Sequence, residues 1–264
     1  MARLKPLFPN ASPWGWAAGG ALLGLTVAVL VFAPARWLTA ALQQISTGRL
    51  ILAEPRGTLW NGSAQLLLAG GTGSSDAAAL PGRVAWQMRP AWGHWKAFIN
   101  APCCTRRPLQ LQATPRWGGM QLTLADDQSQ WPAALLAGLG TPWNTIQAEG
   151  TLSLSTRGLS LTLVQGRLAI EGQAQMEALG MSSRLSTLRP MGSYRLTLKG
   201  GSSATLQLDT LEGSLQLTGS GRWVGSRLHF EGTASAEPER VDALSNLLNI
   251  IGQRKGARSI IKVG

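Results

Sequence analysis

Residues 151–163 read TLSLSTRGLSLTL, two alternating pieces with Gly158 between them. Apolar and polar residues take turns along both pieces, which is the pattern of a β-strand with one buried and one solvated face. The leucine content favours a helix by intrinsic propensity, but the alternation and the bounding glycines favour strands. The segment therefore predicts two short antiparallel strands that meet at Gly158.

The same alternation recurs along most of the chain. It is clear in the second half and present in the first, at residues 50–52, 58–60, 64–68, 83–88, 109–113, 120–124, 168–170, 194–198, 204–208, 214–218 and 227–231. Glycines bound most of these pieces, and Asn61-Gly62 predicts a hairpin turn. Residues 70–80, rich in Gly, Ser, Ala and Thr, predict a flexible loop. We expect a mainly β fold of roughly twelve strands, a curved antiparallel sheet that forms a half-barrel or a sandwich.

A few short helices interrupt this pattern. Residues 131–139 predict a helical turn or two, and a break between subdomains is possible near residues 131–142. After Pro238 an apolar face recurs at spacings of three and four residues and ends at Gly252. Its members are Val241, Leu244, Leu247, Leu248 and Ile251. This face either packs on the sheet of the same chain or binds a partner.

An uncharged apolar segment, residues 14–33, precedes all the strands. About 20 helical residues span the hydrocarbon core of a bilayer, and tryptophans suit both of its boundaries. The segment predicts one transmembrane helix, while a cleavable signal peptide with a site near Ala33-Pro34-Ala35 is the alternative. Arg3 and Lys5 favour a cytoplasmic N-terminus. The expected divisions are a tail at 1–13, the anchor at 14–33, an amphipathic helix at 34–48 and an exported β domain at 49–264.

Composition excludes several classes of protein. The net charge is +11, but the arginines are scattered singly and no nucleic-acid-binding signature is present. We therefore expect no nucleic-acid partner, and the basicity suits anionic lipid headgroups, an acidic partner or plain solubility. No phosphate loop, zinc-protease motif or nucleophile elbow occurs, so we expect no catalytic residues, no cofactor and no metal.

Two adjacent cysteines, Cys103 and Cys104, are the only ones in the chain. They lack the further ligands that a zinc site needs. In an oxidising compartment they could close a disulfide with each other or cross-link to another chain. A disulfide between the two neighbours is our hypothesis.

Several ordered motifs resemble the type II secretion system protein N family. They are Gly57-Thr-Leu-Trp-Asn-Gly62, Ala134-Leu-Leu-Ala-Gly-Leu-Gly-Thr-Pro-Trp143, Pro190-Met-Gly-Ser-Tyr-Arg195, and Leu247-Leu-Asn-Ile-Ile-Gly252 followed by Arg254. The motif residues that we take as candidate sites are Gly57, Trp60, Asn61, Gly62, Pro190, Gly192, Tyr194, Gly252 and Arg254. The resemblance covers nearly the whole chain.

The resemblance implies a non-enzymatic accessory component of the machinery that exports folded proteins across the outer membrane. It would be anchored in the bacterial inner membrane and would face the periplasm. Its partners would be other inner-membrane or pseudopilus proteins. The alternative is an AsmA-like envelope protein whose curved sheet binds or carries lipid.

Overall fold

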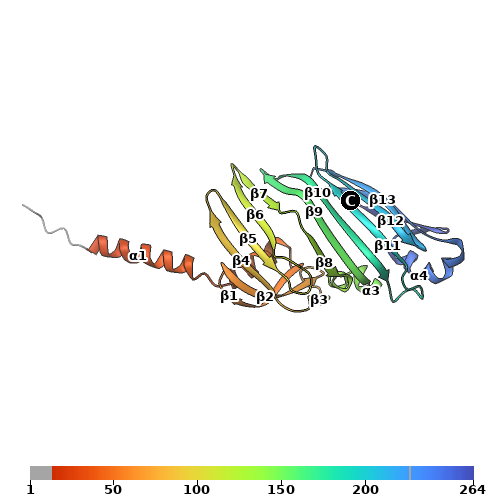
Figure 1. The fold of residues 1–264 in the computed structure, drawn as a ribbon, viewed down its shortest axis with the longest axis horizontal. Coiled ribbons are helices and arrows are strands. Elements are labelled where there is room, and N and C mark those ends of the chain that lie inside the picture. Colours follow the sequence, from red (N-terminus) through yellow and green to blue (C-terminus); the bar gives the residue numbers. More distant parts are fainter. Residues whose placement is uncertain (1–13, 226) are drawn as a thin grey trace, which may run out of the picture.

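A computed structural model describes residues 14–225 and 227–264. It consists of an N-terminal apolar helix, a second helix and one open antiparallel sheet (Figure 1). The strands are β1 (Leu50–Gly57), β2 (Asn61–Ala69), β3 (Ala77–Ala79), β4 (Val84–Ala91), β5 (His94–Asn100), β6 (Leu109–Arg116), β7 (Gly119–Leu124), β8 (Gln128–Pro132), β9 (Glu149–Val164), β10 (Arg167–Ser182), β11 (Gly192–Lys199), β12 (Thr205–Gly213), β13 (Leu215–Val224), β14 (Arg227–Ala236), β15 (Gln253–Lys255) and β16 (Arg258–Val263). The α-helices are α1 (Trp14–Val31), α2 (Arg36–Ile45), α3 (Trp143–Ile146) and α4 (Val241–Ile251), and the 3-10 helices are η1 (Ala133–Leu139) and η2 (Pro238–Arg240). The predicted mainly β class is confirmed.

The sheet is a nearly continuous meander. Its order is β1-β2-β4-β5-β6-β7-β9-β10-β11-β12-β13-β14-β16-β15, with β3 beside β2 and β8 beside β9. All sixteen strands belong to this one sheet, so of the two architectures left open the sandwich is absent from the described residues. The expected number of roughly twelve strands was too low, because β3, β5, β8 and β15 lie outside the segments with a clear alternating pattern.

The predicted strand break at Gly158 is wrong. β9 and β10 run past Gly158 and Gly172, where two residues of β9 oppose one residue of β10. This is a β-bulge, and both glycines have positive φ, +58° and +80°. A Cβ on Gly172 would lie 2.1 Å from the Gly158 carbonyl oxygen. The glycines therefore bend a continuous pair of strands, and the hairpin lies at Gln165-Gly166 instead.

The predicted turn at Asn61-Gly62 is also displaced. Gly57 pairs with Gly62, so the connection is Thr58-Leu59-Trp60 and Asn61 already belongs to β2. Gly62 is a glycine for a different reason: a Cβ there would lie 2.5 Å from the Trp86 ring. Gly62 thus allows close packing and does not form the turn. The positive φ near this connection falls on Gly57 instead.

One further sequence interpretation needs correction. Residues 70–80 are not wholly a loop, because β3 pairs with β2 and Leu80 is buried. At the far edge of the sheet the outermost strand is β15, which pairs with the first half of β16. The connection between β10 and β11 is irregular.

The two ends of the strands differ in what covers them. We name one end the hairpin rim: it carries the short connections at residues 58–60, 92–93, 117–118 and 165–166. The other end, the covered rim, carries η1, α3 and α4, and the main core lies there. In Figure 1 the hairpin rim is at the top, near the labels of β7 and β10, and α3 lies at the opposite, lower strand ends.

The apolar face of α4 packs inside the domain. Leu244, Leu247 and Leu248 are almost fully buried against Leu215 of β13 and Ala234 of β14. Ile251 is half-buried against the same cluster. Of the two roles left open for this face, the structure shows packing on the chain's own sheet. The three leucines are not accessible to a partner.

This packing predicts that Leu248→Ala lowers the free energy of unfolding by about 2–5 kcal/mol, the cost of a cavity in a tight core. Urea unfolding of the full chain in detergent, followed by the β-sheet circular dichroism signal, measures it. Leu211→Ala is the matched control, because that side chain is 38 % exposed on β12. The control should change stability by about 0.5 kcal/mol or less. Equal losses in the two variants would contradict the packing.

Candidate functional site at the anchor junction

The connection between β1 and β2 is bound to the chain that follows α1. Ala35 donates its N–H to the Gly57 carbonyl, and Leu59 donates to the Ala33 carbonyl. Pro34 and Thr58 form an isolated β-bridge between these two bonds. Ala33 and Ala35 are consequently buried. The Gly57–Gly62 motif thus forms a clasp on the residues where the apolar helix ends, and we name it the anchor junction.

Trp60 reaches from this junction to α1 itself. Its indole Nε1 donates to the Leu30 carbonyl at 2.7 Å. This carbonyl lies in the last turn of α1, where no intrahelical donor remains to satisfy it. The Trp60 ring also stacks on Trp95 of β5, with 5.4 Å between ring centroids. One side chain therefore links the end of α1 to the fourth strand along the sheet.

A second tryptophan, Trp86, packs against the connection between β1 and β2. Trp86 of β4 is buried, and its Nε1 donates to the Leu59 carbonyl at 3.1 Å. Its ring fills the space that the missing Cβ of Gly62 leaves. Ala35, Ala64 and Leu38 of α2 pack around it. The sequence placed Trp86 on the apolar side of a strand, but gave no signal for Trp95, which lies in a stretch without clear alternation.

Helix α1 makes no buried contact within the described chain. All its residues from Trp14 to Val31 are exposed, although none is charged. Figure 1 shows it projecting away from the sheet. By length and composition it can cross a membrane, and a helix of this length spans about 27 Å.

The motif at residues 190–195, which contains Tyr194, lies in the main core. Tyr194 is buried beside Leu244 and Leu248 of α4, and its hydroxyl has no hydrogen-bond partner among the described residues. A Cβ on Gly192 would lie 2.7 Å from this hydroxyl. Pro190 is exposed in the connection before β11. Burial raises the pKa of the Tyr194 phenol above its ordinary value.

The motif at residues 247–252, followed by Arg254, ends α4. A Cβ on Gly252 would lie 2.3 Å from the Ile260 carbonyl oxygen, so the chain passes too close to β16 for a larger residue. The Arg254 guanidinium donates to the Ser245 carbonyl and to Asn249 Oδ1, each at 3.1 Å. A cation at this end of a helix also suits its dipole. Arg254 thus holds the helix against the hairpin that follows.

The candidate residues therefore form two groups. Tyr194, Gly192, Gly252 and Arg254 surround α4 and have structural roles. Gly57, Trp60, Asn61 and Gly62 lie at the opposite end of the sheet, at the anchor junction. Only this second group contacts α1 and the residues that directly follow it.

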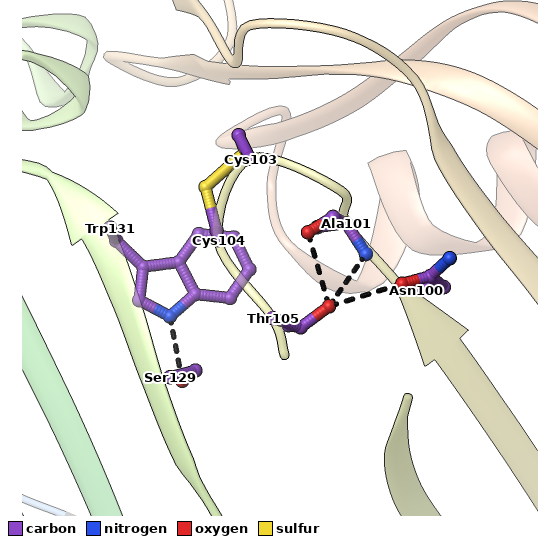
Figure 2. The surroundings of a disulfide bond; sticks show 7 residues. All are labelled: Asn100, Ala101, Cys103, Cys104, Thr105, Ser129 and Trp131. Atoms are coloured by element: carbon purple, nitrogen blue, oxygen red, sulfur yellow. Dashed lines mark hydrogen bonds between the residues drawn. A yellow bond between two sulfur atoms is a disulfide. The ribbon is translucent and has the colours of Figure 1, made fainter. Parts of the chain in front are cut away.

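Cys103 and Cys104 are joined by a disulfide, as hypothesised. Cys104 is buried against Trp131, and Trp131 Nε1 donates to Ser129 Oγ at 2.9 Å (Figure 2). Thr105 Oγ1 accepts the Ala101 N–H at 3.0 Å within the same loop. The disulfide loop thus closes one end of the smaller core on the covered rim.

The described residues contain no cluster of three His, Cys, Asp or Glu side chains that could hold a metal ion. Asp126 and Asp127 accept backbone N–H groups of Gly158 and Gln128. His94 Nδ1 lies 3.0 Å from the Trp92 carbonyl oxygen. These polar groups serve local structure.

The comparison with protein families agrees with the motifs. A family model described as type II secretion system (T2SS), protein N, matches residues 48–261. The chain belongs to this family. The match covers the sheet from the start of β1 into β16, and membership makes the chain a component of type II secretion. Searches of curated proteins and of solved structures found no match.

The junction predicts a specific effect of Trp60→Phe. The variant keeps an aromatic ring for Trp95 but loses the bond to the Leu30 carbonyl, and one such bond contributes about 1 kcal/mol. Hydrogen exchange of residues 31–36 in the full chain in detergent should accelerate accordingly. Trp223→Phe on β13 is the control and should leave these amides unchanged. Unaltered exchange in Trp60→Phe would show that this bond does not hold the anchor.

Tyr194 predicts a loss of stability at high pH. An unfolded phenol titrates at a pKa of about 10, whereas burial keeps the folded phenol protonated. The folded chain then binds the extra proton, so its stability is full below pH 10 and falls as pH rises above it. Tyr194 is the only tyrosine, so phenolate absorbance reports it alone.

Tyr194→Phe should abolish this part of the pH dependence without loss of stability at neutral pH, because the hydroxyl has no partner to lose. Urea unfolding at neutral and alkaline pH measures both variants. A folded chain whose phenol ionises near pH 10 would contradict the prediction.

Proposed function

We propose that the chain is a single-pass, non-catalytic subunit of the type II secretion machinery in the bacterial inner membrane. Residues 14–33 span the membrane, residues 1–13 form a cytoplasmic tail, and the sheet lies in the periplasm as a docking platform. The lipid-carrier alternative gains no support from the family match, and we do not propose it.

The observation that carries this proposal is the anchor junction. A fully exposed apolar helix is costly in water and stable in a bilayer. Trp60 and the clasp at Gly57–Gly62 tie the end of this helix to the sheet. The family motif nearest the helix thus serves its attachment, which suits a retained anchor better than a cleaved signal peptide.

Charge supports the orientation. Arg3 and Lys5 precede the apolar segment, and such residues favour the cytoplasmic side. The sheet that follows is also basic, but long domains cross largely regardless of their charge. The disulfide between Cys103 and Cys104 suits the oxidising periplasm.

A sheet edge supports docking of a partner strand. The edge at β1 is blunted by Pro55 and by a bulge in which Glu54 has a positive φ of +47°. At the other edge, β15 pairs with residues 258–260 of β16 only. Beyond them, no described strand lies beside β16 on the side away from β14. We infer that another secretion component adds a strand here, along residues 261–263 and next to Lys262.

Site-specific photocrosslinking in secreting cells tests this function. A photoreactive residue in place of Lys262 should form adducts with another secretion component, because the open edge of β16 exposes its backbone there. The same residue in place of Arg56, on the blunted edge, is the matched control and should form few. Protein adducts at Arg56 alone would overturn the docking edge. A chain absent from the inner-membrane fraction would overturn the anchor.

A further inference from the structure

An apolar patch lies along the hairpin rim, from the β4–β5 hairpin to β10. Trp92 and Trp117, at the tips of the β4–β5 and β6–β7 hairpins, are 102 % and 97 % exposed. Four more side chains between 39 % and 52 % exposed continue it: Trp95, Met120, Leu163 and Leu168. We name these six residues the rim patch. Six exposed large apolar side chains gathered along one rim mark an interaction surface.

Strand register makes the four strand members of the rim patch neighbours. Met120 of β7 pairs with Leu163 of β9, and Leu163 pairs with Leu168 of β10. Directly paired residues share a face of the sheet. Trp95 joins the same face through Ala113, which lies two residues before Pro115, the partner of Met120. The patch is thus a strip on one face that runs beneath the two tryptophan tips.

Cations flank the rim patch and carboxylates are missing. No Asp or Glu occurs from residue 77 to residue 125, which covers β3 to β7. The exposed cations near the hairpin tips are Arg89, Lys96, Arg116 and Arg167. Strand register places them on the face of the sheet opposite the apolar strip, because successive residues of a strand point to opposite faces and each cation neighbours, or pairs with a neighbour of, a strip residue. Within the described chain none of these four forms an ion pair: Arg89 lies over the Phe98 ring, and Arg116 donates to Gln121. Their charge remains available to an anion.

The rim patch adjoins the end of α1. The Leu30 carbonyl binds Trp60, Trp60 stacks on Trp95, and Trp95 lies three residues from the Trp92 tip. Since α1 spans about 27 Å, Leu30 lies close to one boundary of a hydrocarbon core about 30 Å thick. The contacts therefore place Trp95 at the level of that boundary and Trp92 near it.

We propose that the rim patch inserts into the headgroup region of the periplasmic leaflet of the membrane that α1 spans. Trp92 and Trp117 lie at headgroup depth, where indole is favoured, and the flanking cations bind the phosphates of anionic phospholipids. This proposal rests on the proposed function, because it takes α1 as the anchor. A bilayer surface fits better than a protein partner, since the tryptophans stand on hairpin tips amid cations rather than in a groove.

Such contacts would hold the sheet at a fixed tilt. One helix and a short linker alone leave a domain free to swing about its anchor. Two hairpin tips added to α1 give three points of attachment, and three points define a plane. The far end of the sheet, with the open edge at β15 and β16, would then point away from the membrane toward other secretion components.

Hydrogen exchange on the full chain in nanodiscs tests the proposal. With phosphatidylethanolamine and phosphatidylglycerol, amides of residues 91–94 and 116–119 should exchange more slowly than in detergent. In Trp92→Ser/Trp117→Ser this protection should be lost. These side chains are fully exposed at turns, so the double variant should fold, and unchanged protection of β9 and β10 confirms it.

Charge reversal provides a matched pair of variants. Arg89→Glu/Arg116→Glu should reduce the protection by at least about fivefold, the effect of losing one cation at an anionic surface. Arg106→Glu/Arg107→Glu makes the same change of net charge on the covered rim and should leave the protection intact. Nanodiscs of phosphatidylcholine alone should give protection close to that of the charge-reversed variant.

Other outcomes overturn the inference in distinguishable ways. If the chain enters nanodiscs but the tips exchange as fast as in detergent, the rim patch does not meet the membrane, while the anchor stands. If the chain does not enter nanodiscs, the anchor fails as well. A photoreactive residue at position 92 that captures a protein in cells, and no lipid, would make the rim patch a protein-docking surface instead.

Discussion

The sheet is covered mainly along one rim, and much of the molecule follows from this constraint. A single open sheet satisfies its backbone through neighbouring strands, but it has no second sheet to bury its apolar face. Here η1, α3 and α4 supply that cover at one set of strand ends. At the opposite ends α2 covers only the strands around Trp86, and the hairpin tips at Trp92 and Trp117 stay exposed. Stability and interaction are thus largely separated along the length of the same strands.

The family motifs divide along the same line. Gly192, Tyr194, Gly252 and Arg254 keep α4 against the covered rim, where the main core lies. Gly57, Trp60 and Gly62 act at the hairpin rim, where the anchor joins the sheet. The motif residues therefore belong to two structural contacts: the packing of α4 on the sheet and the attachment of α1 to the sheet. This organisation is consistent with the proposed docking role in type II secretion.

Tryptophan is the residue that links these features. Trp86 packs under the turn, Trp60 binds the helix, and Trp95 carries the contact to the next hairpin. Each uses a large apolar ring together with a single N–H donor, a combination suited to the boundary between lipid and water. The exposed Trp92 and Trp117 extend the same chemistry to the tips of the rim.

The sequence by itself determined the strand-rich class, the apolar helix, the family and which residues form the apolar face of α4, because these depend on the period of apolar residues and on ordered motifs. It misplaced the turns at Asn61-Gly62 and Gly158, since a glycine needed for close approach or for a bulge looks the same as one needed for a turn. Only the tertiary structure decided that Trp60 reaches Leu30 and stacks on Trp95. Those contacts join residues about 30 positions apart or more, and their geometry depends on strand register, which no local pattern records.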